Sequence, residues 1–400
     1  MASSAVLVSI VSLLLAQPAS VPSRYYDIQA EGLDAADAGR MLDQLHQQLR
    51  PFFGKPPENR IPVFVYAARA EFEQALAEEG YSAGDLGGGY SVASGKIYLC
   101  LQPSQYYTRH LLLHEATHQF HAANTPSLKL PRAFWYREGI AEYFAMHNWD
   151  GQRLRTGVVP AISIEDYPQQ ALQWLEEGDL QELVADKTEC PRPAAWALVH
   201  FLLHKHARKF RVLREMLDRN QPPLPAWRKV FGASPRVMRK DLRAWLTGHQ
   251  QPWQNVWIAW QERGAVLEGR NLKGQALAVL KQTPQRMQVE LQPGDGRWQA
   301  GLVFGYQSPA DFATAQILAD GKLWIRRRWQ VLAEPFFVDR GPDGDRPVRI
   351  ELIQAADQVT VKVAGYESPP LEAPGQMGLT VGEGCVQFQV QIERDTAAAR

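Results

Sequence analysis

Two histidines and a glutamate within RHLLLHEATHQF, residues 109–120, have the types and spacing of a zinc site. Residues four apart on an α-helix share a face, so His114 and His118 can direct two imidazoles at one ion. Zinc binds neutral imidazole nitrogen well, and a catalytic zinc site uses three protein ligands and a water. Glu115 is turned by about 100° from His114, which lets it reach that water and act as a general base. The pattern predicts hydrolysis at one zinc ion per chain.

The apolar context of this motif strengthens the prediction. Three leucines precede His114 and Phe120 follows His118, so the segment is apolar enough to be buried. Buried imidazoles and a buried carboxylate need partners, and a metal ion supplies them. Without this context, an isolated HExxH pattern is explained equally well as an ordinary polar helix face.

The third ligand distinguishes types of zinc hydrolase. An extended HExxHxxGxxH pattern needs glycine and histidine where this chain has His121 and Asn124, so that type is excluded. Glu138 stands 20 positions after His118, within FWYREGIAEYF. A loop between the two segments lets a second helix fold back against the first. We therefore predict that Glu138 is the third ligand.

Three further polar residues accompany the predicted ligands. Glu142 lies four positions after Glu138, hence on the same helix face, and either accepts a hydrogen bond from a ligand histidine or is a solvated carboxylate. His110 and His121 share the motif helix and are expected at the surface or as partners of the ligands.

HEATHQF followed by FWYREGIAEYF resembles the gluzincin metallopeptidases of the MA clan. More narrowly, it is similar to the DUF1570, peptidase-MA-like branch of exported bacterial proteins. The resemblance covers about residues 23–250. It implies that His114, His118 and Glu138 bind Zn²⁺, that Glu115 is the general base, and that a peptide or protein is the substrate.

The resemblance also implies a substrate-binding strand and an oxyanion donor. In gluzincins an edge strand before the active helix binds extended peptide by strand addition, and the matching residues here are Gly89, Tyr90 and Ser91. A Tyr or His commonly stabilises the oxyanion some 60 residues beyond the glutamate ligand. His200 lies 62 positions beyond Glu138. Other candidates for this donor are Tyr143 and Tyr90.

Where relatives often carry a tyrosine ahead of the helix that holds His200, this chain has CPRP at 190–193. That departure leaves the donor open. Two hypotheses follow: an active peptidase, or a catalytically inactive gluzincin-fold binding or scaffold protein.

The elements that must position the site read as mixed helix and strand. Helical spacing occurs over 35–53 and 69–80, with a buried strand over 60–67 between them. A hairpin is expected within 87–101, and Ser104 is the expected N-cap of a motif helix that closes near Asn124. Further helices are expected within residues 131–148, 167–178, 193–217 and 235–248. The fold class is α+β, with a gluzincin-type domain of a small sheet and helices over 21–250.

After residue 265 the pattern changes to short alternating strands, as in 348–354 and 386–393. Such strands predict an antiparallel sandwich over 255–395. The segment resembles the concanavalin A-like lectin/glucanase jelly roll, of laminin-G or DUF1080 style. Such folds often bind glycan through exposed aromatic side chains, and the candidates, which could equally be core residues, are Trp298, Tyr306, Trp324 and Trp329. No pair of acids at glycosidase-like spacing is present, so binding or a structural role is expected.

The first 20 residues read as an export signal. Residues 5–16 are apolar and are followed by QPASVPS, but no basic residue precedes them, so an N-terminal membrane anchor is the alternative. The apolar run is shorter than the about 20 residues of a spanning helix, and no later segment qualifies, so no stable membrane span is expected after signal removal. A periplasmic, cell-surface or secreted protein is expected.

Charge and cysteine usage limit the partners. Lys+Arg and Asp+Glu are both 43, so a nucleic-acid partner is not expected. Cys100, Cys190 and Cys385 lie far apart and form no CxxC pair. Either Cys100 pairs with Cys190 in a disulfide, or all three are buried thiols.

Overall fold

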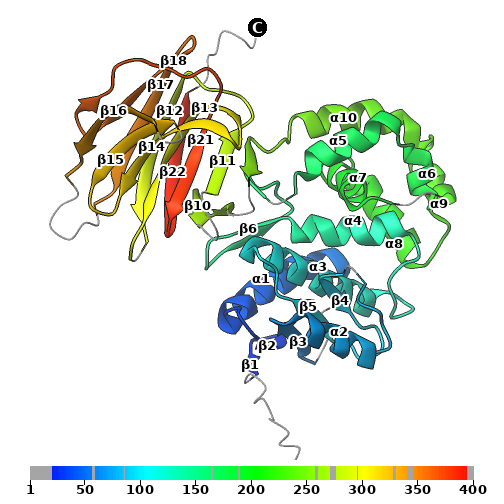
Figure 1. The fold of residues 1–400 in the computed structure, drawn as a ribbon. Coiled ribbons are helices and arrows are strands. Elements are labelled where there is room, and N and C mark those ends of the chain that lie inside the picture. The colour runs from blue at the N-terminus through cyan, green and yellow to red at the C-terminus, as the bar shows by residue number, and fades with distance from the viewer. Residues whose placement is uncertain are drawn as a thin grey trace, which may run out of the picture.

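The computed structural model describes residues 20–55, 59–84, 86–163, 165–187, 190–256, 260–270, 276–294, 296–327, 330–339 and 346–393. Helices and strands are mixed up to residue 247, and strands dominate from residue 253 onward, as Figure 1 shows. The expectation of an α+β chain with an antiparallel β-sandwich is therefore confirmed.

The first part is built on a five-stranded sheet of order β1-β2-β3-β5-β4. Its strands are β1 (Val21–Pro22), β2 (Tyr26–Ala30), β3 (Ile61–Tyr66), β4 (Gly88–Tyr90) and β5 (Ile97–Cys100). Strands β2, β3 and β5 are parallel, while β4 pairs antiparallel with β5 and forms one edge.

Alternation along β3 sends side chains to both faces of this sheet. Val63 and Val65 join the main core with α1 (Ala35–Phe53), while Phe64 packs in a smaller cluster with Phe72 of α2 (Arg69–Glu78). The predicted helices, central strand and hairpin of this region are confirmed.

The motif lies on α3 (Gln105–Asn124), which begins where the Ser104 Oγ accepts a hydrogen bond from the Tyr107 N–H at 3.4 Å. Residues around nearly its whole circumference are buried, because the sheet, α1 and α4 (Phe134–Ala145) all pack against it. Helix α7 (Arg192–Lys205) covers the far side of α4. The two helices approach closely at Gly139, where a Cβ atom would lie 2.4 Å from the Ala195 carbonyl oxygen.

The remaining helices form a layer over α4 and α7, seen in Figure 1. They are α5 (Tyr167–Glu177), α6 (Leu180–Val184), α8 (Ala207–Asp218), α9 (Pro223–Phe231), the 3-10 helix η1 (Pro235–Met238) and α10 (Arg239–Thr247). The prediction of one helix over 193–217 is wrong, because His206 has non-helical φ and ψ of −134° and 32° and separates α7 from α8. Helix α9 and a hairpin of β6 (His147–Trp149) and β7 (Leu154–Thr156) were not expected.

Two antiparallel sheets form the sandwich. The first contains β9 (Trp260–Arg263), β10 (Val266–Arg270), β12 (Arg286–Pro293), β17 (Val348–Ala355), β18 (Gln358–Val363), β19 (Tyr366–Glu367), β20 (Leu371–Glu372) and β22 (Cys385–Glu393). The second contains β8 (Trp253–Val256), β11 (Ala276–Leu280), β13 (Gln299–Ser308), β14 (Asp311–Leu318), β15 (Lys322–Arg327), β16 (Gln330–Phe337) and β21 (Gln376–Glu383). Their inner faces share one apolar core, the expected arrangement for alternating strands.

The four aromatic residues expected to stack on glycan differ in their exposure. Trp298 and Tyr306 are only 4% and 7% exposed, so they are packing residues and cannot present a ring to a sugar. Trp324 is half-buried on the outer side of β15, where Lys322 and Arg326 each lie 4.4 Å from its ring centroid. Trp329 lies outside the described residues.

Three other expectations concern the whole chain. Cys100, Cys190 and Cys385 are free thiols, which excludes the Cys100–Cys190 bridge in this structure. The export signal was predicted over residues 1–20. Of these, residues 1–19 lie outside the described part of the chain. Among the described helices, none combines the length and the apolarity needed to cross a membrane.

Candidate metal centre

The fold brings His114, His118 and Glu138 together. One ligand atom from each lies within 4.8 Å of the others. The Glu138 Oε2 atom is 3.4 Å from His114 Nε2 and 3.5 Å from His118 Nε2. These separations exceed the usual hydrogen-bond range but match the about 3.3 Å edge of a tetrahedron with metal–ligand distances of about 2.0–2.1 Å. The donor set, two imidazole nitrogens and one carboxylate, is one that zinc accepts.

Burial and charge also suit a cation at this point. The three residues are between 1% and 7% exposed. Burial by itself would raise the pKa of Glu138, yet the adjacent His118 and His114 imidazoles hold that pKa well below its usual value. The Arg137 Nε donates to the other carboxylate oxygen, Oε1, at 3.2 Å, which leaves Oε2 directed at the histidines. Glu138 is therefore an ionised and oriented donor.

Glu142 contacts one candidate ligand, His114, and the neighbouring His110. It is fully buried, and its Oε1 lies 3.2 Å from His114 Nδ1 while its Oε2 lies 2.8 Å from His110 Nε2. A carboxylate on the Nδ1 side of a ligand histidine favours the tautomer whose Nε2 lone pair is free for a metal. The alternative of a solvated Glu142 is wrong, and His110 is a buried partner of Glu142.

Glu115 lies beside the edge strand. It is 7% exposed, and a Cβ atom on Gly88 would lie 3.3 Å from its Cγ and 3.6 Å from its Oε1. A side chain at position 88 would therefore press against the side chain of Glu115, and glycine avoids this. The side chain of Glu115, the predicted base, thus extends from α3 to the main chain of β4 at Gly88.

The pairing of β4 shows which main-chain groups face outward. Gly87 and Ser91 both bond to β5, through Gly87 O with Cys100 N at 2.9 Å and Ser91 N with Lys96 O at 2.9 Å. Antiparallel pairs alternate, so Gly89 also faces β5, whereas the peptide groups of Gly88 and Tyr90 face the open edge. The expectation that Gly89 and Ser91 offer their main-chain groups to a substrate strand is therefore wrong, because these groups face β5. Tyr90 is the one predicted residue that faces the open edge. Ser91 is in addition a turn residue whose Oγ donates to Glu79 at 2.8 Å.

His200 lies away from the metal ligands. The Trp245 Nε1 donates to its Nδ1 at 2.9 Å, and its ring packs with His204 and His249. Tyr143 joins this cluster, 5.8 Å from the His200 ring centroid. Helix α7 packs against α4 with Ala195 facing Gly139. In this orientation of α7, His200 points toward α10. The oxyanion-donor roles expected for His200 and Tyr143 do not fit this geometry.

The His200 cluster predicts an acid-sensitive fold. Burial first, and then the neighbouring His204 and His249, lower the pKa of His200 from 6.5 to about 3. The folded state therefore resists a proton that the unfolded chain accepts, so stability is complete above about pH 6.5 and is lost as the pH falls toward 3, by at most about 1.4 kcal/mol per pH unit. His200→Gln keeps an acceptor for Trp245 and is expected to reduce this loss.

Urea midpoints at about pH 7 and about pH 4.5 measure the effect in both proteins. The groups that face His200 are Tyr143 from α4, Trp196 and His204 from α7, the backbone of Gly157 and, from α10 and just beyond it, Trp245 and His249. Equal losses of stability in the wild type and the variant would exclude His200 as the source.

Two residues near the site were not predicted from the sequence. Arg192, in the CPRP segment, places Nη1 3.4 Å from Glu142 Oε1. Burial by itself would lower the pKa of Arg192, yet the nearby carboxylates, Glu142 most of all, raise it. The ring centroid of Tyr167 in α5 lies 6.2 Å from that of His110, and burial first, then the charge of Glu142, raises the pKa of Tyr167 well above 10.0. The CPRP departure from the family pattern was the signal for Arg192. No local pattern marks Tyr167.

His121, the last histidine of the motif helix, contacts α8 and not the candidate metal ligands. His121 Nε2 lies 2.8 Å from Asp218 Oδ1, which also accepts from the Tyr136 hydroxyl at 2.8 Å. His121 is 1% exposed, so its expected surface position is wrong. This contact ties α3 and α4 to α8.

Comparison with known proteins adds little to this description. No family model and no curated protein matches the chain. Among solved structures, a carbohydrate-binding module, CBM66 from Bacillus subtilis, is 14% identical with a TM-score of 0.30, covering 34% of this chain and 92% of its own. A putative glycosyl hydrolase from Parabacteroides distasonis is 13% identical with a TM-score of 0.26, covering 36% and 88%.

A Bacillus licheniformis beta-glucanase is 9% identical, with a TM-score of 0.27, covering 34% of this chain and 89% of its own. Similarity at this level carries no conclusion about function. The metallopeptidase resemblance of the first part stays a prediction.

Proposed function

We propose that this chain is a zinc-dependent hydrolase of peptide bonds, with one zinc ion held by His114, His118 and Glu138. The observation that carries the proposal is the convergence of these three donors at separations of 3.4 and 3.5 Å, with the buried Glu115 next to His114 on the same helix. Zinc, when bound, supplies the Lewis acidity that eases loss of a proton from water and polarises a carbonyl group.

The residues of the chain then supply the remaining chemistry. Glu115 takes the proton from the attacking water and delivers it to the leaving amine. Glu142 keeps His114 in the tautomer suited to metal binding. Arg192 places its Nη1 atom 3.4 Å from the Oε1 atom of Glu142. We assign it a positioning role toward Glu142.

The substrate is proposed to add as a strand to the open edge of β4. Gly88 and Tyr90 direct their N–H and C=O groups to that edge, and Gly88 contacts Glu115. An extended peptide paired there would run past the general base, since main-chain hydrogen bonds fix the position of an added strand. The β-sandwich is proposed to be an accessory module that binds glycan or protein.

A paired substitution in β4 tests the contact between Gly88 and Glu115. Gly88→Ala is expected to lower kcat about three- to tenfold, because the new methyl group displaces the base by a few tenths of an ångström. Gly89→Ala is the matched control, since its Cβ meets only Leu76 Cδ2 at an ordinary 3.5 Å. Steady-state kinetics with zinc analysis decides, and equal activity of the two variants contradicts the placement.

The direct test of the function is metal analysis with peptide cleavage. Purified protein is expected to contain about one zinc ion per chain and to cleave members of a mixed peptide library. Dialysis against 1,10-phenanthroline is expected to abolish cleavage, and added zinc to restore it. Zinc-free protein, or cleavage that survives the chelator, would overturn the proposal.

A further inference from the structure

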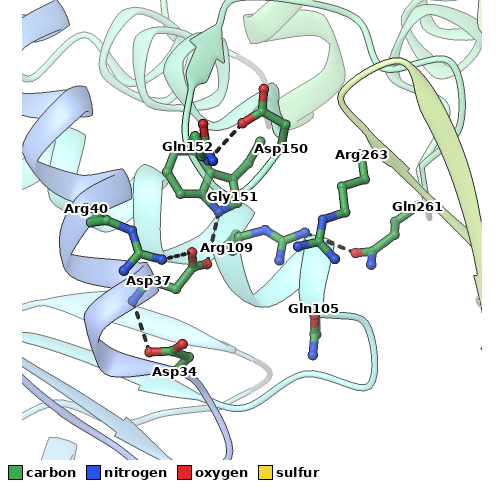
Figure 2. A pocket seen from close by; sticks show the side chains of 11 residues that line it. Asp34, Asp37, Arg40, Gln105, Arg109, Asp150, Gly151, Gln152, Gln261 and Arg263 are labelled. Carbon is green, nitrogen blue, oxygen red and sulfur yellow. Dashed lines mark hydrogen bonds and ion pairs between the residues drawn. The ribbon is translucent and has the colours of Figure 1, made fainter. Parts of the chain in front are cut away.

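A polar cavity of about 430 Å³ lies where α1, α3 and the β6–β7 hairpin meet strand β9 of the sandwich. Figure 2 shows that Arg109 of α3 and Arg263 of β9 direct their guanidinium groups toward the same region of it. Apart from Trp149 and Gly151, the lining residues carry charged or amide side chains. The volume is that of a small-molecule site.

The three carboxylates of the cavity are already engaged. Asp37 accepts from Arg40 at 2.7 Å and from the Trp149 Nε1 at 2.9 Å. Asp34 caps α1 by accepting from the main-chain N–H groups of residues 36 and 37. Asp150 accepts from those of residues 152 and 153, at 2.8 and 2.7 Å. None of the three lies within ion-pair distance of Arg109, and the charge of Asp37 acts on it only at longer range.

Arg109 is a buried cation without an anionic partner. It is 8% exposed, and within the described ranges no carboxylate lies within ion-pair distance of it. Its Nη2 donates to the neutral Gln261 Oε1 at 3.0 Å, while its buried Nε has no hydrogen-bond partner. A buried guanidinium stays charged, and leaving it unpaired is costly.

The neighbouring arginine comes from the other part of the chain. Arg263 pairs with Glu268 at 3.3 Å, and its side chain is 46% exposed. The Gln261 amide, which accepts from Arg109, also donates to Glu268 at 2.6 Å. The buried carboxylate of Glu268 thus pairs with Arg263 and Gln261, and Arg109 has no carboxylate of the described residues at ion-pair distance.

We propose that this cavity binds a carboxylate-bearing, hydroxyl-rich small molecule, an acidic sugar, whose carboxylate pairs with Arg109 and Arg263. The planar fork of a guanidinium matches a carboxylate in two parallel hydrogen bonds. One buried arginine without an ion pair calls for a monoanion, and the three aspartates of the lining disfavour a dianion such as phosphate. The amides of Gln105 and Gln152 suit sugar hydroxyls, whereas an apolar side chain would find few partners.

This site is independent of the proposed zinc centre. Arg109 lies on the same helix as His114, but it contacts the sandwich through Gln261, whereas the ligand histidines face Glu138 of α4. Glu115→Gln is therefore expected to leave sugar binding unchanged. Failure of one proposal does not decide the other.

Calorimetric titration of the full chain with D-glucuronate tests the proposal. Saturable binding of one molecule per chain is expected. D-glucose, which lacks the carboxylate, and acetate, which lacks the hydroxyls, are each expected to bind at least about tenfold more weakly. Inorganic phosphate is expected to compete poorly. No saturable binding of glucuronate, or equal binding of glucose, would overturn the proposal, and tighter binding of phosphate would overturn the choice of a carboxylate.

Two substitutions locate the binding. Arg263→Gln, on a half-exposed side chain, and Arg109→Gln are each expected to weaken glucuronate binding at least about tenfold. Arg153→Gln, an exposed arginine on the adjacent hairpin, is the matched control and is expected to bind like the wild type. Unchanged binding by folded Arg263→Gln protein would contradict the assignment even if Arg109→Gln failed to fold.

Discussion

Glu115→Gln is expected to lower kcat for peptide cleavage by about 10²- to 10⁴-fold, the usual contribution of a general base. Glutamine keeps the shape of the side chain against Gly88 but cannot take a proton from water. Because Glu115 is not one of the three donors that converge, zinc content is expected to stay at about one per chain. The loss should therefore appear in kcat without a loss of metal.

Initial rates on the best library peptide, measured beside zinc analysis, check this prediction. Glu215→Gln provides the matched control, because Glu215 is an exposed carboxylate on α8. If the wild type and Glu115→Gln are equally inactive while both retain zinc, the chain is a metal-bearing binding or scaffold protein. If both cleave at the same rate, Glu115 is not the base.

Glu138→Gln is expected to release the zinc ion and to abolish cleavage. The substitution replaces an ionised ligand with a neutral amide and leaves only the two histidines, fewer than the three protein ligands of a catalytic zinc site. Glu142→Gln keeps all three ligands and is expected to weaken zinc about 10- to 100-fold, since it removes the carboxylate that lies 3.2 Å from His114 Nδ1.

Competition with a chromogenic zinc chelator ranks the affinities. The expected order, from the tightest, is wild type and Glu215→Gln, then Glu142→Gln, then Glu138→Gln. Circular dichroism of each variant separates loss of metal from loss of fold. Folded Glu138→Gln protein that binds zinc like the wild type would exclude Glu138 as a ligand, and with it the proposed site.

Much of the ligand arrangement followed from local pattern. A spacing of four residues on a helix places His114 and His118 on one face wherever that helix lies, and Ser104 begins the helix in a way the sequence signals. The spacing of Glu138 and Glu142 follows the same rule on α4. A loop between two helices favours an antiparallel return, so the meeting of both helices was predictable.

Contacts across elements were not predictable in the same way. The partner of His200 depends on how α7 rotates against α4, and the close approach at Gly139 decides that rotation. The outward-facing groups of β4 depend on the alternation of its pairing with β5, so of the predicted Gly89, Tyr90 and Ser91 only Tyr90 faces the open edge, together with Gly88.

The sequence by itself determined the types and helical spacing of the candidate zinc donors, the general base and the alternating strands of the sandwich. These are periodic properties, and periodicity is set by backbone geometry alone. The tertiary structure decided which side chains from distant segments meet: Arg192 with Glu142, His110 with Glu142, and Arg109 with Gln261. Such meetings depend on packing angles and register, because a rotation of one helix or a shift of one strand residue changes which side chains face each other.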